Sequence, residues 1–249
     1  MARSFLRAVL VTVGLLLVWE AVVRVFALPA FILPSPVRVA GAFQERGAYL
    51  LDNTLVTLSE ILLGFVIGSL LGAATALAMS AVPLARRLIL PAVIVTQALP
   101  VFAIAPLLVL WFGYGMASKI VMATLIIYFP VASAFHDGLS RTDPGLIDLA
   151  RLNRAGPLQT LALFRMPAAL PSLLSGLKVA AAVAPIGAVV GEWVGSSAGL
   201  GFVMLQANAR LQSDVLFAAL FCLATMAVAL RLGVDAAARR LAPWAPETL

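Results

Sequence analysis

The sequence predicts an all-α polytopic membrane protein with six transmembrane helices. Its mean hydropathy is +1.07, and 63% of its 249 residues are hydrophobic while only 11% are charged. A helix needs about 20 predominantly apolar residues to cross the hydrocarbon core of a bilayer. Six apolar stretches of roughly that length occur: Phe5–Phe26, Thr54–Met79, Leu88–Phe112, Lys119–Phe135, Ser175–Val194 and Val215–Val234.

The first stretch resembles a signal peptide in having a basic end, formed by Arg3 and Arg7. Its apolar run is longer than a typical signal core, and the sequence around Ala27 is a poor cleavage site. We therefore expect an uncleaved first span.

The length of the chain predicts a single transmembrane domain over residues 1–249. One cysteine and one histidine occur in the whole sequence. A single cysteine excludes an intrachain disulfide, and we expect no structural metal site.

The distribution of basic residues predicts that both termini are cytoplasmic. With that orientation most of the 17 Lys and Arg residues fall on the cytoplasmic side, as the positive-inside rule requires. Topology then accounts for the net charge of +6, and we expect no nucleic-acid partner.

Small residues recur every four positions in two of the predicted spans. Gly64, Gly68 and Gly72 lie in the second span, and Gly187 and Gly191 lie in the fifth. This spacing puts them on one helical face and permits close approach of another helix. We favour packing within the chain over a dimer interface.

Prolines interrupt two of the predicted spans. Pro185 is expected to bend the fifth span, and Pro91, Pro100 and Pro106 are expected to interrupt the third. Broken helices are common where a transport pathway crosses a helical bundle.

A basic stretch, Asp148–Pro167, separates the fourth and fifth spans. Asp143 followed by Pro144 is typical of a helix start. Gly156 can take the left-handed conformation that ends a helix, and Pro157 cannot continue it. A second short helix is expected over Leu158–Arg165. The sequence thus predicts two short helices that meet at a cytoplasmic bend.

Two interpretations of this bend remain open. Leu149, Leu152, Leu161 and Phe164 supply apolar surface beside the arginines. An amphipathic connector could lie on the inner leaflet with its arginines on lipid phosphates. Alternatively, the bend is a docking surface for a cytoplasmic protein.

The stretch resembles the conserved cytoplasmic "EAA" loop of ABC importer permeases. Asp148, Leu149 and Ala150 stand where Glu-Ala-Ala usually stands, and Met166-Pro167 stands where Leu-Pro follows. Arg154 occupies the usual glycine position. The segments "TQALPVFAIAPLLVLWFGYGMASK", "YFPVASAFHDGL" and "GEWVGSSAGLGFVM" resemble the branch for nitrate, sulfonates, taurine and pyrimidine precursors of thiamine.

The resemblance implies that the chain is the permease subunit of an ATP-driven importer in a bacterial inner membrane and is not itself an enzyme. It is most similar to permeases for hydroxymethylpyrimidine or formylaminopyrimidine, with sulfonate, taurine or nitrate as alternatives. A stand-alone secondary transporter or channel is the alternative of another class. The residues implied in ATPase coupling are Asp148, Leu149, Ala150, Arg151, Arg154, Ala155, Gly156, Phe164 and Pro167.

The resemblance also implies partners and cofactors. Two cytoplasmic ATPase subunits would each grip one loop, a second permease copy would complete the pathway, and an extracytoplasmic binding protein would deliver the solute. ATP and Mg²⁺ would be bound by the ATPase. The chain itself has no Gly-x-x-x-x-Gly-Lys-Ser/Thr loop to hold phosphates.

Five residues are candidates for the transport pathway: Gln97, Pro100, Pro185, Glu192 and Asn208. Glu192 carries the most informative charge, because carboxylates within a membrane usually face the bundle interior or a cavity. The alternative is an interfacial acid that is already in water. Gln97 could instead bridge two helices.

The segment "GSSAG" matches the Gly-x-Ser-x-Gly pattern of hydrolases, with Ser197 in the nucleophile position. A nucleophilic serine needs a base. The single histidine, His136, is expected at the opposite end of the bundle, about 30 Å away. We therefore interpret the glycines as turn residues.

Overall fold

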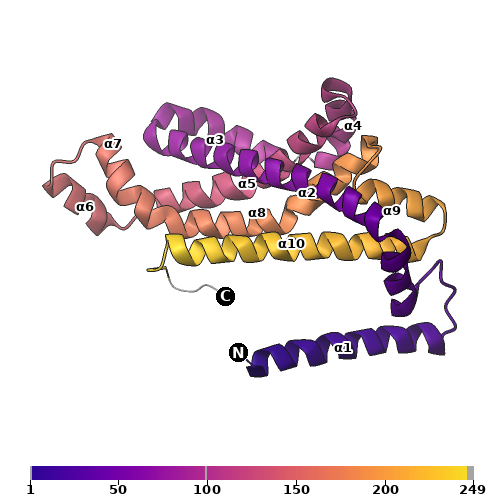
Figure 1. The fold of residues 1–249 in the computed structure, drawn as a ribbon. Coiled ribbons are helices and arrows are strands. Elements are labelled where there is room, and N and C mark those ends of the chain that lie inside the picture. The colour runs from indigo at the N-terminus through magenta and orange to yellow at the C-terminus, as the bar shows by residue number, and fades with distance from the viewer. Residues whose placement is uncertain (1, 99, 246–249) are drawn as a thin grey trace. The chain divides into compact units, whose positions relative to one another are not determined.

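The computed structural model describes residues 2–98 and 100–245, and their secondary structure is helical throughout, without strands. Figure 1 shows the helices in chain order. Their bounds are α1 Ala2–Val25, α2 Pro36–Ala81, α3 Pro83–Ala98, α4 Val101–Phe112, α5 Met116–Ser140, α6 Pro144–Leu152, α7 Pro157–Thr160, the π-helical turn η1 Leu161–Arg165, α8 Met166–Gly195, α9 Leu200–Ala209 and α10 Ser213–Leu241.

Four helical segments of the described chain are long and apolar enough to cross a membrane: Pro36–Ala81, Met116–Ser140, Pro157–Gly195 and Ser213–Leu241. α3 and α4 together supply a fifth span if the broken pair crosses as one. The all-α membrane class is therefore confirmed, whereas the count of six spans stays a prediction.

The predicted third span is two helices rather than one. Pro100 precedes α4 in an extended conformation, with φ −68° and ψ 112°. Pro91 and Pro106 lie inside continuous helices, so the expectation that all three prolines interrupt the span holds only for Pro100. Pro185 likewise lies within the unbroken helix α8.

The chain divides into two compact units. One comprises Met1–Val56 with Ser197–Ala224, and the other comprises Thr57–Ser196 with Thr225–Leu249. α2 and α10 each contribute to both units.

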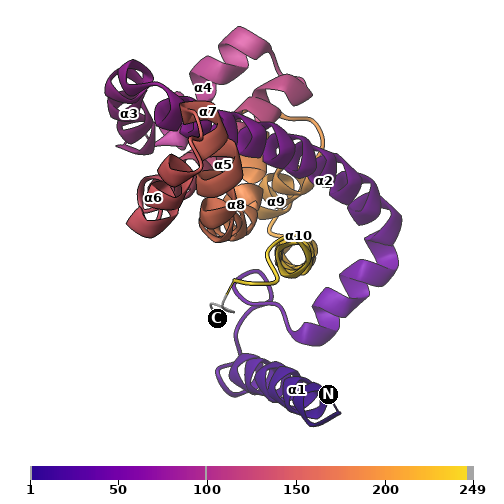
Figure 2. The same cartoon turned by 90° about the vertical axis from the view of Figure 1, so that its left-hand side faces the viewer.

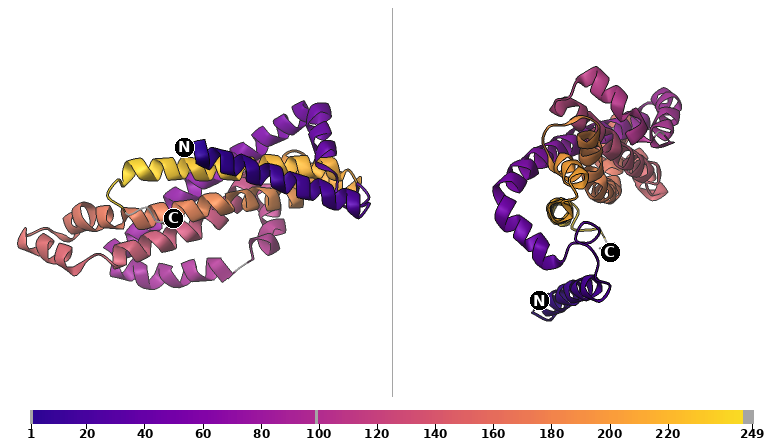
Figure 3. Two further views of the ribbon diagram at one scale, coloured as in Figure 1. Left: turned by 90° about the horizontal axis from the view of Figure 1, so that it is seen from below. Right: turned by 90° about the vertical axis from the view of Figure 1, so that its right-hand side faces the viewer.

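In the larger unit α5 is the central helix and runs alongside α8 (Figures 2 and 3). α5 buries an almost continuous face, which includes Met122, Ala123, Ile127 and Val131. Because protein interiors are close-packed, neighbouring helices can approach this face of α5 closely only where their own side chains are small.

The glycines at four-residue spacing on α2 and α8 lie against this face of α5. A Cβ atom at Gly68 would lie 2.9 Å from Ile127, and one at Gly187 would lie 2.6 Å from the Cα of Ala123. A Cβ atom at Gly64 would likewise overlap the Cβ atom of Ala123. Gly72 and Gly191 also contact α5, against Tyr128 and Lys119. Both glycine faces pack against α5, which confirms the interpretation as packing within the chain.

The smaller unit is held by aromatic and polar contacts among distant segments. Trp19 of α1 lies 5.6 Å from Phe217 and 6.1 Å from Phe221 of α10, measured between ring centroids. The Ser213 hydroxyl donates to the carbonyl of Phe31 at 2.6 Å.

The turn before α9 belongs to the smaller unit. The N–H of Gly199 donates to Asn53 Oδ1 at 2.7 Å, and Gly199 has φ 103°. Few side chains tolerate that backbone conformation. The interpretation of "GSSAG" as a turn is consistent with this geometry.

Candidate functional site

The basic stretch is preceded by the start of α6, which has the predicted cap. Asp143 Oδ1 accepts a hydrogen bond from the N–H of Gly145 at 2.6 Å, and Pro144 is the first helical residue. The acceptor satisfies a donor that the first turn leaves unpaired, and proline at this position removes no helical bond. The predicted helix start is confirmed.

The bend after α6 is a Schellman motif with Arg154 in the left-handed conformation. The N–H of Ala155 bonds the carbonyl of Ala150 at 2.9 Å, and the N–H of Arg154 bonds that of Arg151 at 2.9 Å. These two bonds together define the motif. Arg154 has φ 54°, whereas Gly156 is extended with φ −70° and ψ 169°. The prediction that Gly156 is the left-handed residue at the end of the helix was wrong.

The reason lies in the residue that follows Gly156. Pro157 disfavours the helical conformation of the residue before it and pushes that residue toward extended backbone. The left-handed position therefore falls on Arg154, which is where the resemblance places a glycine. An arginine here carries the steric cost that glycine avoids.

The second helix of the bend is much longer than predicted. α7 continues through η1 into α8, so Pro157–Gly195 is one helical segment of 39 residues. The N–H of Met166 bonds the carbonyl of Leu161, five residues earlier. This wider turn directly precedes Pro167, whose ring would clash with a carbonyl in an ordinary α-helix. The expected helix end at Met166-Pro167 was wrong.

α6 lies near the end of the helical segment that continues into α8 (Figure 1). It carries charged and apolar side chains together. Asp148 and Arg151 form an ion pair of 3.0 Å, with side chains 66% and 76% exposed. Leu149 and Leu152 are also exposed, while Ala150 is buried. The exposed face of α6 therefore carries both charged and apolar side chains.

Beyond the bend, the apolar side chains differ in exposure. Leu161 is buried against Phe135, Leu139 and Ala169. The prediction that its side chain contributes to the exposed apolar surface of the bend was wrong. Phe164 is half-buried and Pro167 is exposed. The wide turn of η1 rotates the following residues relative to an α-helical register, which sequence periodicity does not anticipate.

Arg165 ties the bend to the ends of two other helices. Its Nε and Nη2 donate to the carbonyl of Leu139 at 3.1 and 2.7 Å, and its Nη1 lies 3.5 Å from the carbonyl of Ser80. Carbonyls at helix C-terminal ends have no helical partner and attract cations. The basic stretch is therefore anchored to α5 and α2 rather than tethered only by its chain ends.

Glu192 lies inside the larger unit and is 1% exposed. The Thr57 hydroxyl donates to Glu192 Oε1 at 2.6 Å. Glu60, one turn from Thr57 on α2, is also buried, and its carboxyl group is in hydrogen-bonding contact with that of Glu192. The interfacial alternative for Glu192 therefore does not fit its burial.

Lys119 lies close enough to both carboxyl groups for direct electrostatic interaction, and its side chain is buried. Its Nζ donates to the carbonyls of Tyr114, Gly115 and Gly195. The ammonium thus joins the start of α5 to the end of α8. Buried charges require partners of this kind, because desolvation of an isolated charge is costly.

We name Thr57, Glu60, Lys119 and Glu192 the buried polar cluster. Of these four residues, only Glu192 was predicted from the sequence. A signal for Glu60 was present, because an acid within an apolar span is rare and usually functional. No local pattern indicated that residues 57, 60, 119 and 192 meet.

The other pathway candidates are placed differently. Pro185 is buried on α8, two helical turns before Glu192. Pro100 is exposed at the start of α4, and the side chain of Gln97 lies outside the described residues. Asn208 is exposed on α9 and belongs to the other compact unit.

The structure is an all-helical membrane chain with an exposed, anchored bend between two spans. This arrangement is typical of the membrane subunit of a transporter. Residues 64–245 match the family described as binding-protein-dependent transport system inner membrane component. The chain belongs to this family, and it is the permease subunit of an ABC transporter, a multi-pass protein of the inner membrane.

Three related proteins match almost the whole chain. A probable ABC transporter permease protein of Haemophilus influenzae is 50% identical, over 94% of this chain and 96% of the relative. The riboflavin transport system permease protein RibX of Chloroflexus aurantiacus is 35% identical, over 94% and 88%. The formylaminopyrimidine transport permease protein ThiX of Halalkalibacterium halodurans is 31% identical, over 98% of each.

A solved structure has the same fold. The inward-facing MetNI methionine ABC transporter aligns with a TM-score of 0.60 and 21% identity, over 78% of this chain and 94% of that chain. Permease subunits are not enzymes, so these similarities disfavour the hydrolase interpretation of "GSSAG". They equally disfavour a transporter that works without an ATPase.

Proposed function

We propose that this permease carries a pyrimidine precursor of thiamine, of the hydroxymethylpyrimidine or formylaminopyrimidine type. The observation that carries the proposal is the similarity to ThiX over 98% of both chains. The resemblance of "VAPIGAVVGEWVGSSAGLGFVMLQANARLQSDVLFAAL" to the same group supports it. Riboflavin is a second candidate, because RibX is 35% identical. Sulfonate, taurine and nitrate are further alternatives.

We propose that the exposed face of α6 binds the ATPase. Its helix start is capped, its end is fixed by a Schellman motif, and Arg165 anchors the adjoining helix to α5 and α2. A rigid and exposed helix can transmit force, because movement of its partner is not absorbed by a flexible loop. The coupling residues in this proposal are Asp148, Leu149, Ala150, Arg151, Arg154, Ala155, Gly156, Phe164 and Pro167.

The proposed assembly contains two ATPase subunits, which bind ATP and Mg²⁺, two identical permease copies and an extracytoplasmic binding protein. In it, residues 1–249 act as one transmembrane domain with both termini in the cytoplasm. Buried Glu192 and Pro185 line the pathway, together with Gln97, Pro100 and Asn208. The burial of charged Glu192 in an apolar bundle supports this role for α8.

Reconstitution in vesicles tests the proposal. The chain is reconstituted alone and then with its ATPase and binding protein, and hydroxymethylpyrimidine, formylaminopyrimidine, riboflavin, taurine and nitrate are offered separately. We expect uptake and ATP hydrolysis to require both partners and a pyrimidine. Uptake of riboflavin, taurine or nitrate instead would reject the pyrimidine assignment while leaving the permease role intact.

A further inference from the structure

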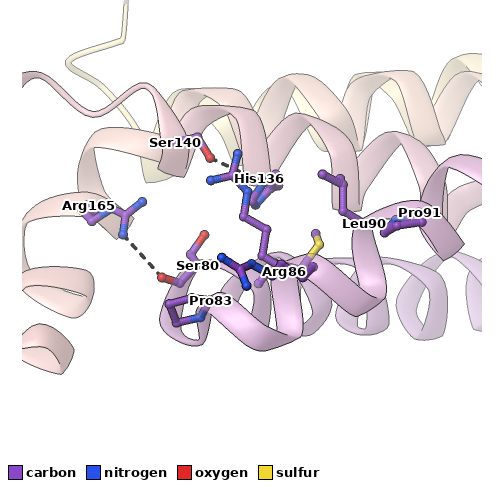
Figure 4. Close-up of a pocket in the computed structure, with 10 residues that line it drawn as sticks. Ser80, Pro83, Arg86, Leu90, Pro91, His136, Ser140 and Arg165 are labelled. Atoms are coloured by element: carbon purple, nitrogen blue, oxygen red, sulfur yellow. Dashed lines mark hydrogen bonds between the residues drawn. The ribbon is translucent and has the colours of Figure 1, made fainter.

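A basic pocket lies at the end of the larger unit that carries the bend, at the opposite end of α5 from the buried polar cluster. Its volume is about 560 Å³, and it is bounded by the end of α2, the start of α3, the end of α5 and η1 (Figure 4). The polar residues that line it are Ser80, Arg86, Arg87, His136, Ser140 and Arg165.

The pocket has a strong excess of positive charge. Three of its lining side chains are arginines and none is acidic. Arg165 donates to backbone carbonyls, which leave its charge unneutralised. Within residues 2–98 and 100–245, Arg86 and Arg87 form no ion pair. Such a pocket attracts an anion.

Two polar atoms of the lining residues lack a partner in the described part of the chain. His136 is 6% exposed and its Nδ1 is buried without a hydrogen bond, and the same holds for Ser80 Oγ. The His136 ring lies between Ser140 and Arg86 in the wall of the pocket (Figure 4). Buried polar atoms are normally satisfied. Both atoms are closed to solvent in the structure, so each side chain would have to rotate toward the pocket to bond an oxyanion there.

The geometry points to a phosphate group as the ligand. Guanidinium groups bind phosphate oxygens through paired N–H donors, and histidine and serine add further donors. The volume exceeds that of one phosphate and has room for a substituent on it. We propose that this pocket binds a phosphate group, either in the headgroup of an anionic phospholipid or as the free ion.

The surroundings favour the lipid headgroup as the source. On α3, Leu84 and Leu88 flank Arg86 and Arg87, and they are 63% and 68% exposed. Apolar side chains next to arginines suit acyl chains beside a headgroup. Basic pockets between helices at the cytoplasmic surface are known to bind such headgroups. The pocket is independent of the transported solute, so this inference goes beyond the proposed function.

Lipid binding to the purified full-length chain tests the inference. The chain is delipidated in detergent and titrated with phosphatidylglycerol, phosphatidylcholine or inorganic phosphate, and bound ligand is measured by native mass spectrometry and by thermal shift. The test variant is Arg86→Gln/Arg87→Gln. The matched control is Arg239→Gln/Arg240→Gln, a second exposed arginine pair, at the end of α10.

We expect phosphatidylglycerol to bind more tightly than phosphatidylcholine, and the test variant to lose about tenfold in that affinity. The control should change less than about twofold. Stabilisation by inorganic phosphate alone, lost in the test variant, would identify the free ion as the source. Equal effects in the two variants, or binding of neither phosphatidylglycerol nor phosphate, would overturn the inference. Elution of both variants at the wild-type volume excludes misfolding as the cause.

Discussion

At the scale of single residues, Arg154 is the most informative backbone position. It adopts φ 54° at the end of α6, a conformation that costs an L-residue roughly 1–2 kcal/mol. We expect Arg154→Gly to raise the free energy of unfolding by about 0.5–1 kcal/mol, after allowance for the greater freedom of glycine in the unfolded chain. Thermal unfolding in detergent measures the effect.

Asn153→Gly is the matched control for this substitution. Asn153 has φ −81°, and its side chain donates to the carbonyl of Leu149 at 2.8 Å. Glycine relieves no strain there and removes a hydrogen bond, so we expect lower stability. An Arg154→Gly variant that is less stable than wild type would contradict the strain argument.

Glu192 provides a residue-scale prediction about transport. Glu192→Gln keeps an acceptor for the Thr57 hydroxyl but removes a charge near Lys119. We expect solute uptake to fall by about tenfold or more, since a hydrogen bond to a charged group contributes roughly 1.5–3 kcal/mol. Assembly with the ATPase should be retained.

The control is Glu45→Gln, which makes the same change at an exposed position of α2. It should leave uptake and assembly unchanged. Uptake by the Glu192→Gln variant at the wild-type rate would show that the buried carboxylate has no role in the pathway.

At the scale of elements, α6 carries a prediction about docking. Asp148→Lys reverses a charge on its exposed face and breaks the pair with Arg151. Exposed pairs contribute only about 0–1 kcal/mol, so membrane insertion should be normal. We expect co-purification of the ATPase to be lost. Glu45→Lys, a charge reversal outside α6, should leave co-purification intact, and full recovery of the ATPase with Asp148→Lys would reject the docking surface.

The packing of α2 against α5 carries a second prediction at this scale. A Cβ at Gly72 would lie 2.9 Å from the carbonyl oxygen of Tyr128 and 3.0 Å from the Cβ of Val131, whereas a Cβ at Gly41 meets nothing within 4 Å. We expect Gly72→Ala to lower stability by roughly 1–3 kcal/mol through overpacking. Gly41→Ala, on the same helix, should be neutral or stabilising. Similar melting temperatures for the two variants would contradict the close approach.

At the scale of the whole molecule, the buried polar cluster joins three helices of the larger unit. Lys119 bonds the carbonyl of Gly115 at the start of α5 and that of Gly195 at the end of α8, near Glu60 and Glu192. Lys119→Met would leave the two carboxyl groups without their cation. Loss of one partner of a buried charge pair costs about 3–5 kcal/mol. We expect a large loss of folded protein, measured as monodisperse yield after membrane extraction.

A second variant separates lost charge from lost packing. Lys119→Met combined with Glu60→Gln and Glu192→Gln removes both carboxyl groups together with the ammonium. We expect partial recovery of yield, because no uncompensated charge then remains in the cluster. A triple variant that is worse than Lys119→Met alone would show that packing dominates.

The membrane class, the helix start at Asp143 and the glycine faces of α2 and α8 follow from the sequence alone, because they depend on composition and on spacing along one helix. The meeting of residues 57, 60, 119 and 192 depends on how the helices pack, since their contacts join distant segments. The tertiary structure also assigned the left-handed residue to Arg154 and continued the bend through a π-turn into α8. In both places a proline restricts the backbone beside it, and the remaining chain adopts the geometry that keeps its hydrogen bonds.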